Sequence, residues 1–308
     1  MRRLFKAVML TLSLGILAAV AMWAKPDLLI SIVAQSNPAL LAAALCLSSA
    51  VTFLRVLKWK VLIKGLGFAD AALTQLAGMT VGNFTPGKMG EPVKSLFLKQ
   101  RTGIPASASL PAIIWERMLD ATVMVALAIA GFWAVSLGTV GSVAGLVGVS
   151  IFCILLAIAM AVLRCKRAGF AVLGATKRLP LLNRIGDDFV QTFYASKIRS
   201  VSIMLSLIFT FAVWVLDGAI LWITFAALGV ELPILAAVSI FALSVIIGYA
   251  STLPGGLGST EAVLTLMLIQ LGVSAAVAVS GVFLARALTF WYGTVFGGIA
   301  MLCMAKKA

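Results

Sequence analysis

The chain has 308 residues, of which 62% are hydrophobic and only 11% are charged. A soluble domain usually carries about 25% charged residues, so the composition excludes a soluble globular protein. The formal net charge is +14, but the basic residues cluster between apolar runs, which is typical of cytoplasmic loops in membrane proteins rather than of a nucleic-acid-binding protein.

Several apolar stretches of about twenty residues are long enough to cross the hydrocarbon core of a bilayer. Backbone groups in lipid must be hydrogen-bonded within the protein, so spans are helices or the strands of a closed barrel. The long Leu, Ala and Val runs lack the alternation of barrel strands. The predicted fold class is therefore an all-α polytopic membrane protein, with one transmembrane domain over residues 1–308.

The first predicted span covers about 7–24. Ala19-Val20-Ala21 resembles a signal-peptide cleavage site, but the apolar stretch is long for a signal peptide, so we expect a retained helix. The second span covers about 38–57, and its end is marked as cytoplasmic by a group of basic residues: Arg55, Lys58, Lys60 and Lys64.

Next comes an apolar piece, 71–102, that Pro and Gly interrupt in the middle. Spans are then predicted over about 112–137 and 142–163. The segment 164–199 is predominantly basic and is the largest predicted cytoplasmic loop.

A long span follows over about 201–228, then a second interrupted piece, 233–273, and a last span over about 276–304. Both termini are basic, so both are expected in the cytoplasm, which requires an even number of crossings. About six full spans satisfy this condition. The two interrupted pieces must then enter and leave on the same side, as re-entrant helical hairpins.

The two interrupted pieces resemble each other. Pro86-Gly87-Lys88-Met89-Gly90-Glu91 aligns with Pro254-Gly255-Gly256-Leu257-Gly258-Ser259, and Arg117 then aligns with Arg286 after nearly equal spacing. The first hairpin is expected to enter from the cytoplasm and the second from outside. Inverted repeats at about 39–137 and 201–304 follow, and interrupted helices in such repeats indicate a transporter's midplane site. An old duplication kept only for packing is the alternative.

Charged residues within apolar segments are costly and indicate either a functional site or structural ion pairs. Both hairpins are expected to direct a helix N-terminus inward, with Pro92 opening one helix and Ser259 or Thr260 capping the other. Such termini favour an anion, phosphate above all. The predicted binding residues are Asn83, Pro86, Gly87, Lys88, Gly90, Glu91, Lys94, Glu116, Arg117, Asp120, Pro254, Gly255, Gly256, Gly258, Glu261 and Arg286.

The chain has no histidine, and its four cysteines stand singly. A zinc site and a histidine-activated nucleophile therefore have neither ligands nor a base. No metal, cofactor or catalytic residue is predicted.

Three segments resemble the flippase-like transmembrane domain of lysylphosphatidylglycerol synthase, including stand-alone, hopanoid-associated members: Gly82-Asn83-Phe84-Thr85-Pro86-Gly87-Lys88-Met89-Gly90-Glu91, Trp115-Glu116-Arg117-Met118-Leu119-Asp120 and Leu253-Pro254-Gly255-Gly256-Leu257-Gly258-Ser259-Thr260-Glu261. The resemblance implies a protein of the cytoplasmic (inner) membrane that moves a lipid between leaflets. Lys88 and Lys94 replace the arginines usual in the first motif, and lysine does not bind phosphate in the bidentate mode. Lysyl transfer is not expected.

The favoured function is a transporter, or flippase, that moves an anionic lipid or lipid-linked precursor, most simply one with a phosphate. Two alternatives stay open. One is a membrane-embedded enzyme acting on a lipid head group, with Glu91, Glu116 or Asp120 as acid or base. The other is a non-catalytic partner of lipid- or glycan-building enzymes.

Overall fold

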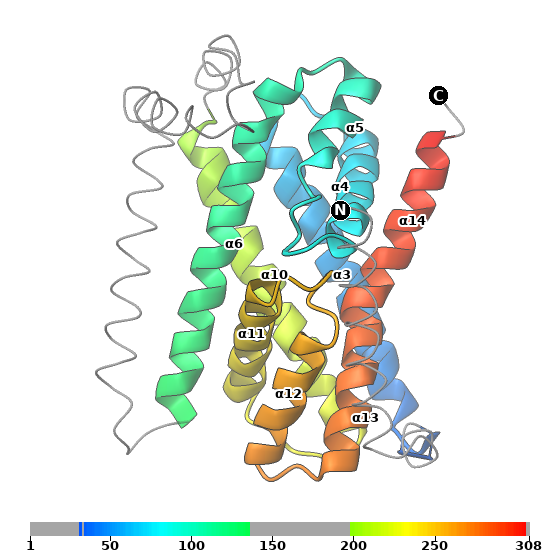
Figure 1. The fold of residues 1–308 in the computed structure, drawn as a ribbon, viewed down its shortest axis with the longest axis vertical. Coiled ribbons are helices and arrows are strands. Elements are labelled where there is room, and N and C mark those ends of the chain that lie inside the picture. The colour runs from blue at the N-terminus through cyan, green and yellow to red at the C-terminus, as the bar shows by residue number, and fades with distance from the viewer. Residues whose placement is uncertain (1–30, 33, 136–197, 306–308) are drawn as a thin grey trace, which may run out of the picture.

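The computed structural model describes residues 31–32, 34–135 and 198–305, and these ranges are helical apart from turns and short connections (Figure 1). The predicted spans at 7–24 and 142–163, and the 164–199 loop up to residue 197, lie outside the described residues. The helices are α3 (Pro38–Leu62), α4 (Phe68–Asn83), α5 (Val93–Thr102), α6 (Ala106–Val135), α10 (Ser200–Ala227), α11 (Ile234–Ala250), α12 (Ser259–Gln270), α13 (Ala275–Arg286), the π-helical turn η1 (Ala287–Trp291) and α14 (Tyr292–Ala305).

Three helices in the described ranges are long and apolar enough to cross a membrane: α3, α10 and the continuous α13–η1–α14, with 25, 28 and 31 residues. A bilayer core needs about 20 residues of helix. These helices agree with the spans predicted from residues 38, 201 and 276 onward. The expectation of an α-helical membrane protein is confirmed.

The two interrupted pieces form helical hairpins. In the first hairpin, α4 and α5 are joined by a tip at residues 84–92, and in the second, α11 and α12 are joined by a tip at residues 251–258. The hairpins come from opposite ends of the molecule, so their tips meet near its middle (Figure 1). The long helices α3, α6, α10 and α13–α14 surround them.

The backbone of the two tips has the same left-handed conformation at aligned positions. Gly87 and Gly255 have φ angles of 53° and 61°, and the next residues, Lys88 and Gly256, have φ angles of 58° and 66°. A left-handed conformation costs an ordinary residue roughly 1–2 kcal/mol. Lys88 therefore stands in a conformation for which the second tip uses glycine.

Matching hydrogen bonds close the two turns, and the tips also pair with each other. The N–H of Met89 donates to the carbonyl of Pro86, and the N–H of Leu257 donates to the carbonyl of Pro254, both at 3.0 Å. Pro86 and Pro254 form an isolated antiparallel bridge. The two proline-glycine turns, which lie 168 positions apart in the sequence, are thus in direct contact.

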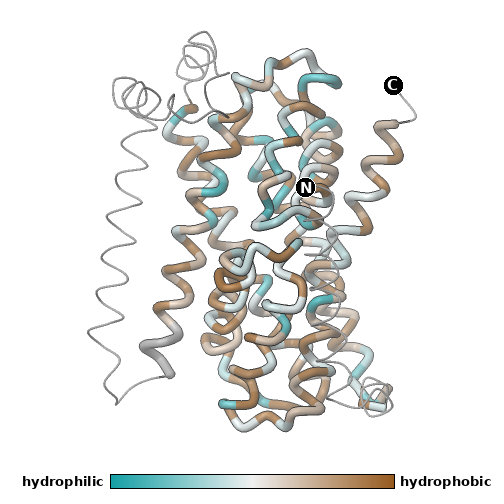
Figure 2. Tube along the Cα trace, viewed as in Figure 1, coloured by the Kyte–Doolittle hydropathy of each residue, from teal (hydrophilic) through white to brown (hydrophobic). Residues whose placement is uncertain are grey.

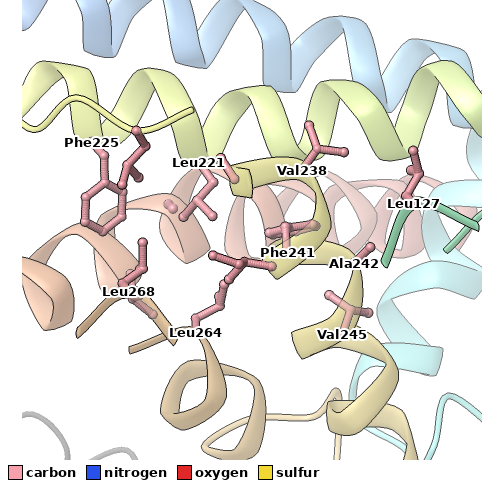
Figure 3. Close-up of a cluster of buried hydrophobic side chains, with 14 of the residues drawn as sticks. Leu127, Leu221, Phe225, Val238, Phe241, Ala242, Val245, Leu264 and Leu268 are labelled. Carbon is pink, nitrogen blue, oxygen red and sulfur yellow. The ribbon is translucent and has the colours of Figure 1, made fainter. Parts of the chain in front are cut away.

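The apolar core is concentrated around the second hairpin. Helices α6, α10, α11, α12 and α13 contribute to one buried cluster that includes Phe225, Phe241, Leu264 and Leu268 (Figure 3). Hydrophilic residues are instead concentrated in the half of the molecule that contains α4 and α5 (Figure 2). The first hairpin therefore depends more on polar contacts than the second.

The first hairpin is held against α14 at a close helix crossing. A methyl group added at Gly297 would overlap the carbonyl oxygen of Leu76 and Oγ1 of Thr80, whereas one added at Gly298 would meet no atom of residues 31–32, 34–135 or 198–305 within 4 Å. Thr80 also donates a hydrogen bond to the carbonyl of Thr294 at 3.2 Å. Gly297 is therefore required by the approach of the two backbones.

We expect Gly297→Ala to destabilise the protein by about 1–3 kcal/mol, the usual cost of overpacking. Gly298→Ala is the matched control, and it should be neutral or slightly stabilising because alanine favours helix more than glycine does. Thermal unfolding of both variants in detergent measures the difference. Equal midpoints for the two variants would contradict the close crossing.

Candidate functional site

Eleven charged side chains are buried or half-buried where the tips meet the long helices. Helices α3, α5, α6, α10, α12 and α13 and the first tip contribute them. The six cations are Arg55, Lys58, Lys88, Lys94, Arg117 and Arg286, and the five carboxylates are Glu91, Glu116, Asp120, Asp217 and Glu261.

Lys94 forms the innermost ion pair of the first hairpin. It is fully buried, and its ammonium binds the carboxylate of Glu116. It also donates to Oε1 of Gln75 at 3.0 Å, lies 3.7 Å from Glu91 and sits 4.2 Å above the ring of Trp59. With these partners, Lys94 anchors α5 to α4, α6 and α3.

Arg117 connects the first tip to α6. Its guanidinium lies 2.8 Å from Glu91 and 2.8 Å from Asp120. Asp120 also accepts from Lys58 at 2.7 Å and from the indole N–H of Trp214 at 3.3 Å. Arg117 and Asp120 thus form an ion pair three residues apart on α6.

The second hairpin has a comparable pair, Arg286 and Glu261. Nε of Arg286 donates to Glu261 at 2.6 Å, and the other carboxylate oxygen of Glu261 accepts from the N–H of Gly258 at 2.7 Å. In each hairpin, therefore, a carboxylate near the start of the second helix binds an arginine on the helix that follows.

The expected helix caps were placed slightly wrongly. Gly258, not Ser259 or Thr260, is the N-cap of α12, because the chain enters the helix through a left-handed φ of 84° that glycine adopts readily; Glu261 then accepts from the N–H of Gly258. Pro92 precedes the first residue of α5 instead of opening it, a displacement of one position.

Two adjoining cavities lie between the hairpins. The lining of the first includes Asn83, Lys88, Asp217, Gly255 and Arg286. The charged residues that line the second come from α3, the first tip and α6: Arg55, Lys58, Lys88, Glu91, Glu116, Arg117 and Asp120. The two cavities share the lining residues Arg55, Met79, Lys88, Trp214 and Tyr249.

Lys88 differs from the other five interior cations. Each of the others lies within 4 Å of a carboxylate, whereas no ion pair of Lys88 occurs among the described residues. Its ammonium lies 5.0 Å above the ring of Tyr249. Lys88 lines both cavities and gives the interior group of six cations and five carboxylates a net charge of +1.

The structure brings the predicted residues together in three positions. Pro86, Gly87, Gly90, Pro254, Gly256 and Gly258 form the tip backbones. The cavity linings contain Asn83, Lys88, Glu91, Glu116, Arg117, Asp120, Gly255 and Arg286. Lys94 and Glu261 line neither cavity, but each forms an ion pair with a residue that does, Glu116 and Arg286 respectively.

The sequence analysis missed two basic residues of this site. Arg55 pairs with Asp217 at 2.5 Å, and Lys58 pairs with Asp120. Both had been assigned to a cytoplasmic helix end with Lys60 and Lys64. The spacing of three residues between Arg55 and Lys58, which places both on one face of a helix, was the available signal.

Comparisons with known proteins agree on one family. The family model described as "Lysylphosphatidylglycerol synthase TM region" matches residues 10–297. A UPF0104 membrane protein of Pyrococcus horikoshii is 23% identical, with 96% of each chain covered. A UPF0104 membrane protein of Methanothermobacter thermautotrophicus is 26% identical, with 96% of this chain and 92% of that protein covered. The apolar helices and these matches make the chain a multi-pass membrane protein.

Proposed function

Because the chain belongs to the family of the lysylphosphatidylglycerol synthase transmembrane region, we propose that it is a transporter moving a lipid between membrane leaflets. The transported lipid has an anionic head group that contains phosphate. The head group lies in the cavities between the two hairpin tips while the acyl or prenyl tails stay in the surrounding lipid. Enzymes of lipid synthesis are the natural partners of such a transporter.

Lys88 is the observation that carries this proposal. A charge withdrawn from water without a counter-ion is unfavourable, yet the half-buried Lys88 lines both cavities and forms no salt bridge among the described residues, its ammonium lying 5.0 Å above the ring of Tyr249. A phosphate bound there would supply the missing negative charge. Arg286 adds a second donor to the first cavity. Its buried Nη2 has no hydrogen-bond partner among the described residues.

The proposed membrane arrangement has about six full spans and two re-entrant hairpins in the inner membrane, with both termini in the cytoplasm. The hairpins belong to inverted repeats over about 39–137 and 201–304. The matched φ angles of the tips and the comparable pairs Arg117–Glu91 and Arg286–Glu261 support this repeat. A midplane site between inverted repeats is the usual arrangement in secondary transporters.

Reconstitution into vesicles tests the transport. The purified protein should move a tail-labelled anionic phospholipid between leaflets, and Lys88→Gln should slow this movement at least about tenfold, because hydrogen bonds to charged groups contribute about 1.5–3 kcal/mol. Lys64→Gln makes the same chemical change at an exposed position and should leave the rate unchanged. Wild-type vesicles that move no lipid faster than protein-free vesicles would refute the proposed function.

A further inference from the structure

Building on the proposed transport of an anionic lipid, we infer that the head group is a phosphodiester with one negative charge, esterified to an uncharged alcohol that carries free hydroxyl groups. A polyol or a sugar is such an alcohol. Two independent features lead to this class: the net charge of the eleven interior charged residues, and the hydrogen-bonding atoms in the lining of the first cavity that lack partners among the described residues.

The net charge of the interior residues determines how many negative charges the head group should carry. The interior group has a net charge of +1, so a phosphodiester neutralises it. A phosphomonoester carries about −1.5 to −2 charges at neutral pH and would leave an excess negative charge. A zwitterionic head group would leave Lys88 uncompensated. Since net charge in a region of low dielectric is costly, the singly charged head group fits best.

Three nearly fully buried side chains of the lining have atoms without a hydrogen-bond partner in the described part of the chain: Asn83, Asp217 and Arg286, with 3%, 1% and 6% exposure. The atoms are Oδ1 of Asn83, Oδ1 of Asp217 and Nη2 of Arg286. Arg286 offers a donor to a phosphate oxygen. The other two are acceptors, and a phosphodiester, which has no donor, cannot satisfy them.

The orientation of the Asn83 amide follows from its neighbours. Oγ1 of Thr294 donates its only proton to the carbonyl of Phe290 at 2.7 Å, so it must accept from Nδ2 of Asn83, which lies 2.8 Å away. The oxygen of the amide is therefore the atom left free. In Asp217, Oδ2 binds Arg55 and Oδ1 is free.

Hydroxyl groups on the head group would supply the donors for these two acceptors. An ammonium group would also donate, but it would cancel the negative charge that balances Lys88. The combination of one negative charge and neutral donors therefore points to a hydroxylated alcohol.

Four lipids with the same labelled tails separate these features in the vesicle assay: phosphatidylglycerol, phosphatidylmethanol, phosphatidic acid and phosphatidylethanolamine. Phosphatidylmethanol has the phosphodiester charge but no hydroxyl donor. We expect phosphatidylglycerol to move fastest, by at least about tenfold over each of the others, since tenfold corresponds to about 1.4 kcal/mol and a buried acceptor left without a donor costs an amount of this order.

Asp217→Asn raises the interior net charge to +2 and retains a polar side chain, so the preference should shift toward phosphatidic acid. Asp70→Asn is the matched control, because Asp70 forms a half-exposed pair with Arg101 away from the cavities. The control should keep the preference of the wild type. Equal rates for phosphatidylglycerol and phosphatidylmethanol, or an unchanged preference in Asp217→Asn, would overturn the head-group assignment while transport itself stands.

Lipid retention by the purified protein provides a second measurement. The detergent-solubilised protein is exchanged against an equimolar mixture of the four lipids, and bound lipid is identified by native mass spectrometry. Selective retention of phosphatidylglycerol supports the assignment even if no lipid is translocated, a result that would refute only the proposed transport. Retention of all four lipids in equal amounts would refute the assignment.

Discussion

Replacing Lys94 with methionine is expected to destabilise the protein by about 3–5 kcal/mol, the typical cost of removing one partner from a buried ion pair. The side chains of Lys94 and Glu116 are both fully buried. Without the ammonium, Glu116 keeps Lys58 at 3.4 Å and Arg117 at 3.5 Å, neither close enough to replace the lost hydrogen bond. The thermal midpoint in detergent should fall by several degrees.

Arg101→Met is the matched control. Arg101 lies at the other end of α5 and binds Asp70 at 2.7 Å, but the two side chains are 21% and 31% exposed. Exposed ion pairs contribute about 0–1 kcal/mol, so this variant should unfold close to the wild type. If the thermal midpoint of Arg101→Met fell as far as that of Lys94→Met, burial of the ion pair would not determine how much stability its removal costs.

A double-mutant cycle distinguishes the pair from general damage to the helix. Glu116→Gln removes the carboxylate charge and keeps the shape of the side chain. If Lys94 and Glu116 act as a unit, the double variant should lose less stability than the sum of the two single variants, because neither charge remains unpaired. Strict additivity would indicate that the two side chains contribute independently.

The fold class and the hairpin tips were predictable because they depend on local sequence properties. Apolar runs long enough to span a bilayer predict helices wherever they occur. Proline and glycine at residues 86, 87, 254 and 255 predict interruptions because of their backbone preferences. Arg117 and Arg286 stood out as charges within apolar segments, and both prove to bind the carboxylate next to their own hairpin tip.

The pairing of the charges was not predictable from one sequence. Arg55 and Lys58 follow an apolar run and precede further lysines, a pattern that usually marks the end of a span. Their actual surroundings depend on Asp217 and Asp120, which are 162 and 62 residues away. Only tertiary packing determines which carboxylates reach α3. The same pattern of basic residues is therefore compatible with the cytoplasmic end of a span and with a buried binding site.

Gly255→Ala is expected to separate the two tips and to slow lipid transport at least about tenfold, through a disturbance of roughly 2–5 kcal/mol from left-handed strain and overpacking together. Gly255 has a φ of 61°. A methyl group there would lie 2.6 Å from the carbonyl oxygen of Asn83 and 2.7 Å from the ring of Phe290. Rates in reconstituted vesicles and the thermal midpoint measure the two effects separately.

Gly229→Ala isolates the part of this cost that comes from the backbone alone. Gly229 has a φ of 75°, is exposed, and has no atom of the described residues within 4 Å of an added methyl group. The Gly229→Ala variant should lose only about 1–2 kcal/mol of unfolding free energy and should retain the wild-type transport rate. If transport by folded Gly255→Ala protein equals that of Gly229→Ala, then close contact of the tips is not required. The head group would then bind without the closed arrangement in which Pro86 and Pro254 pair.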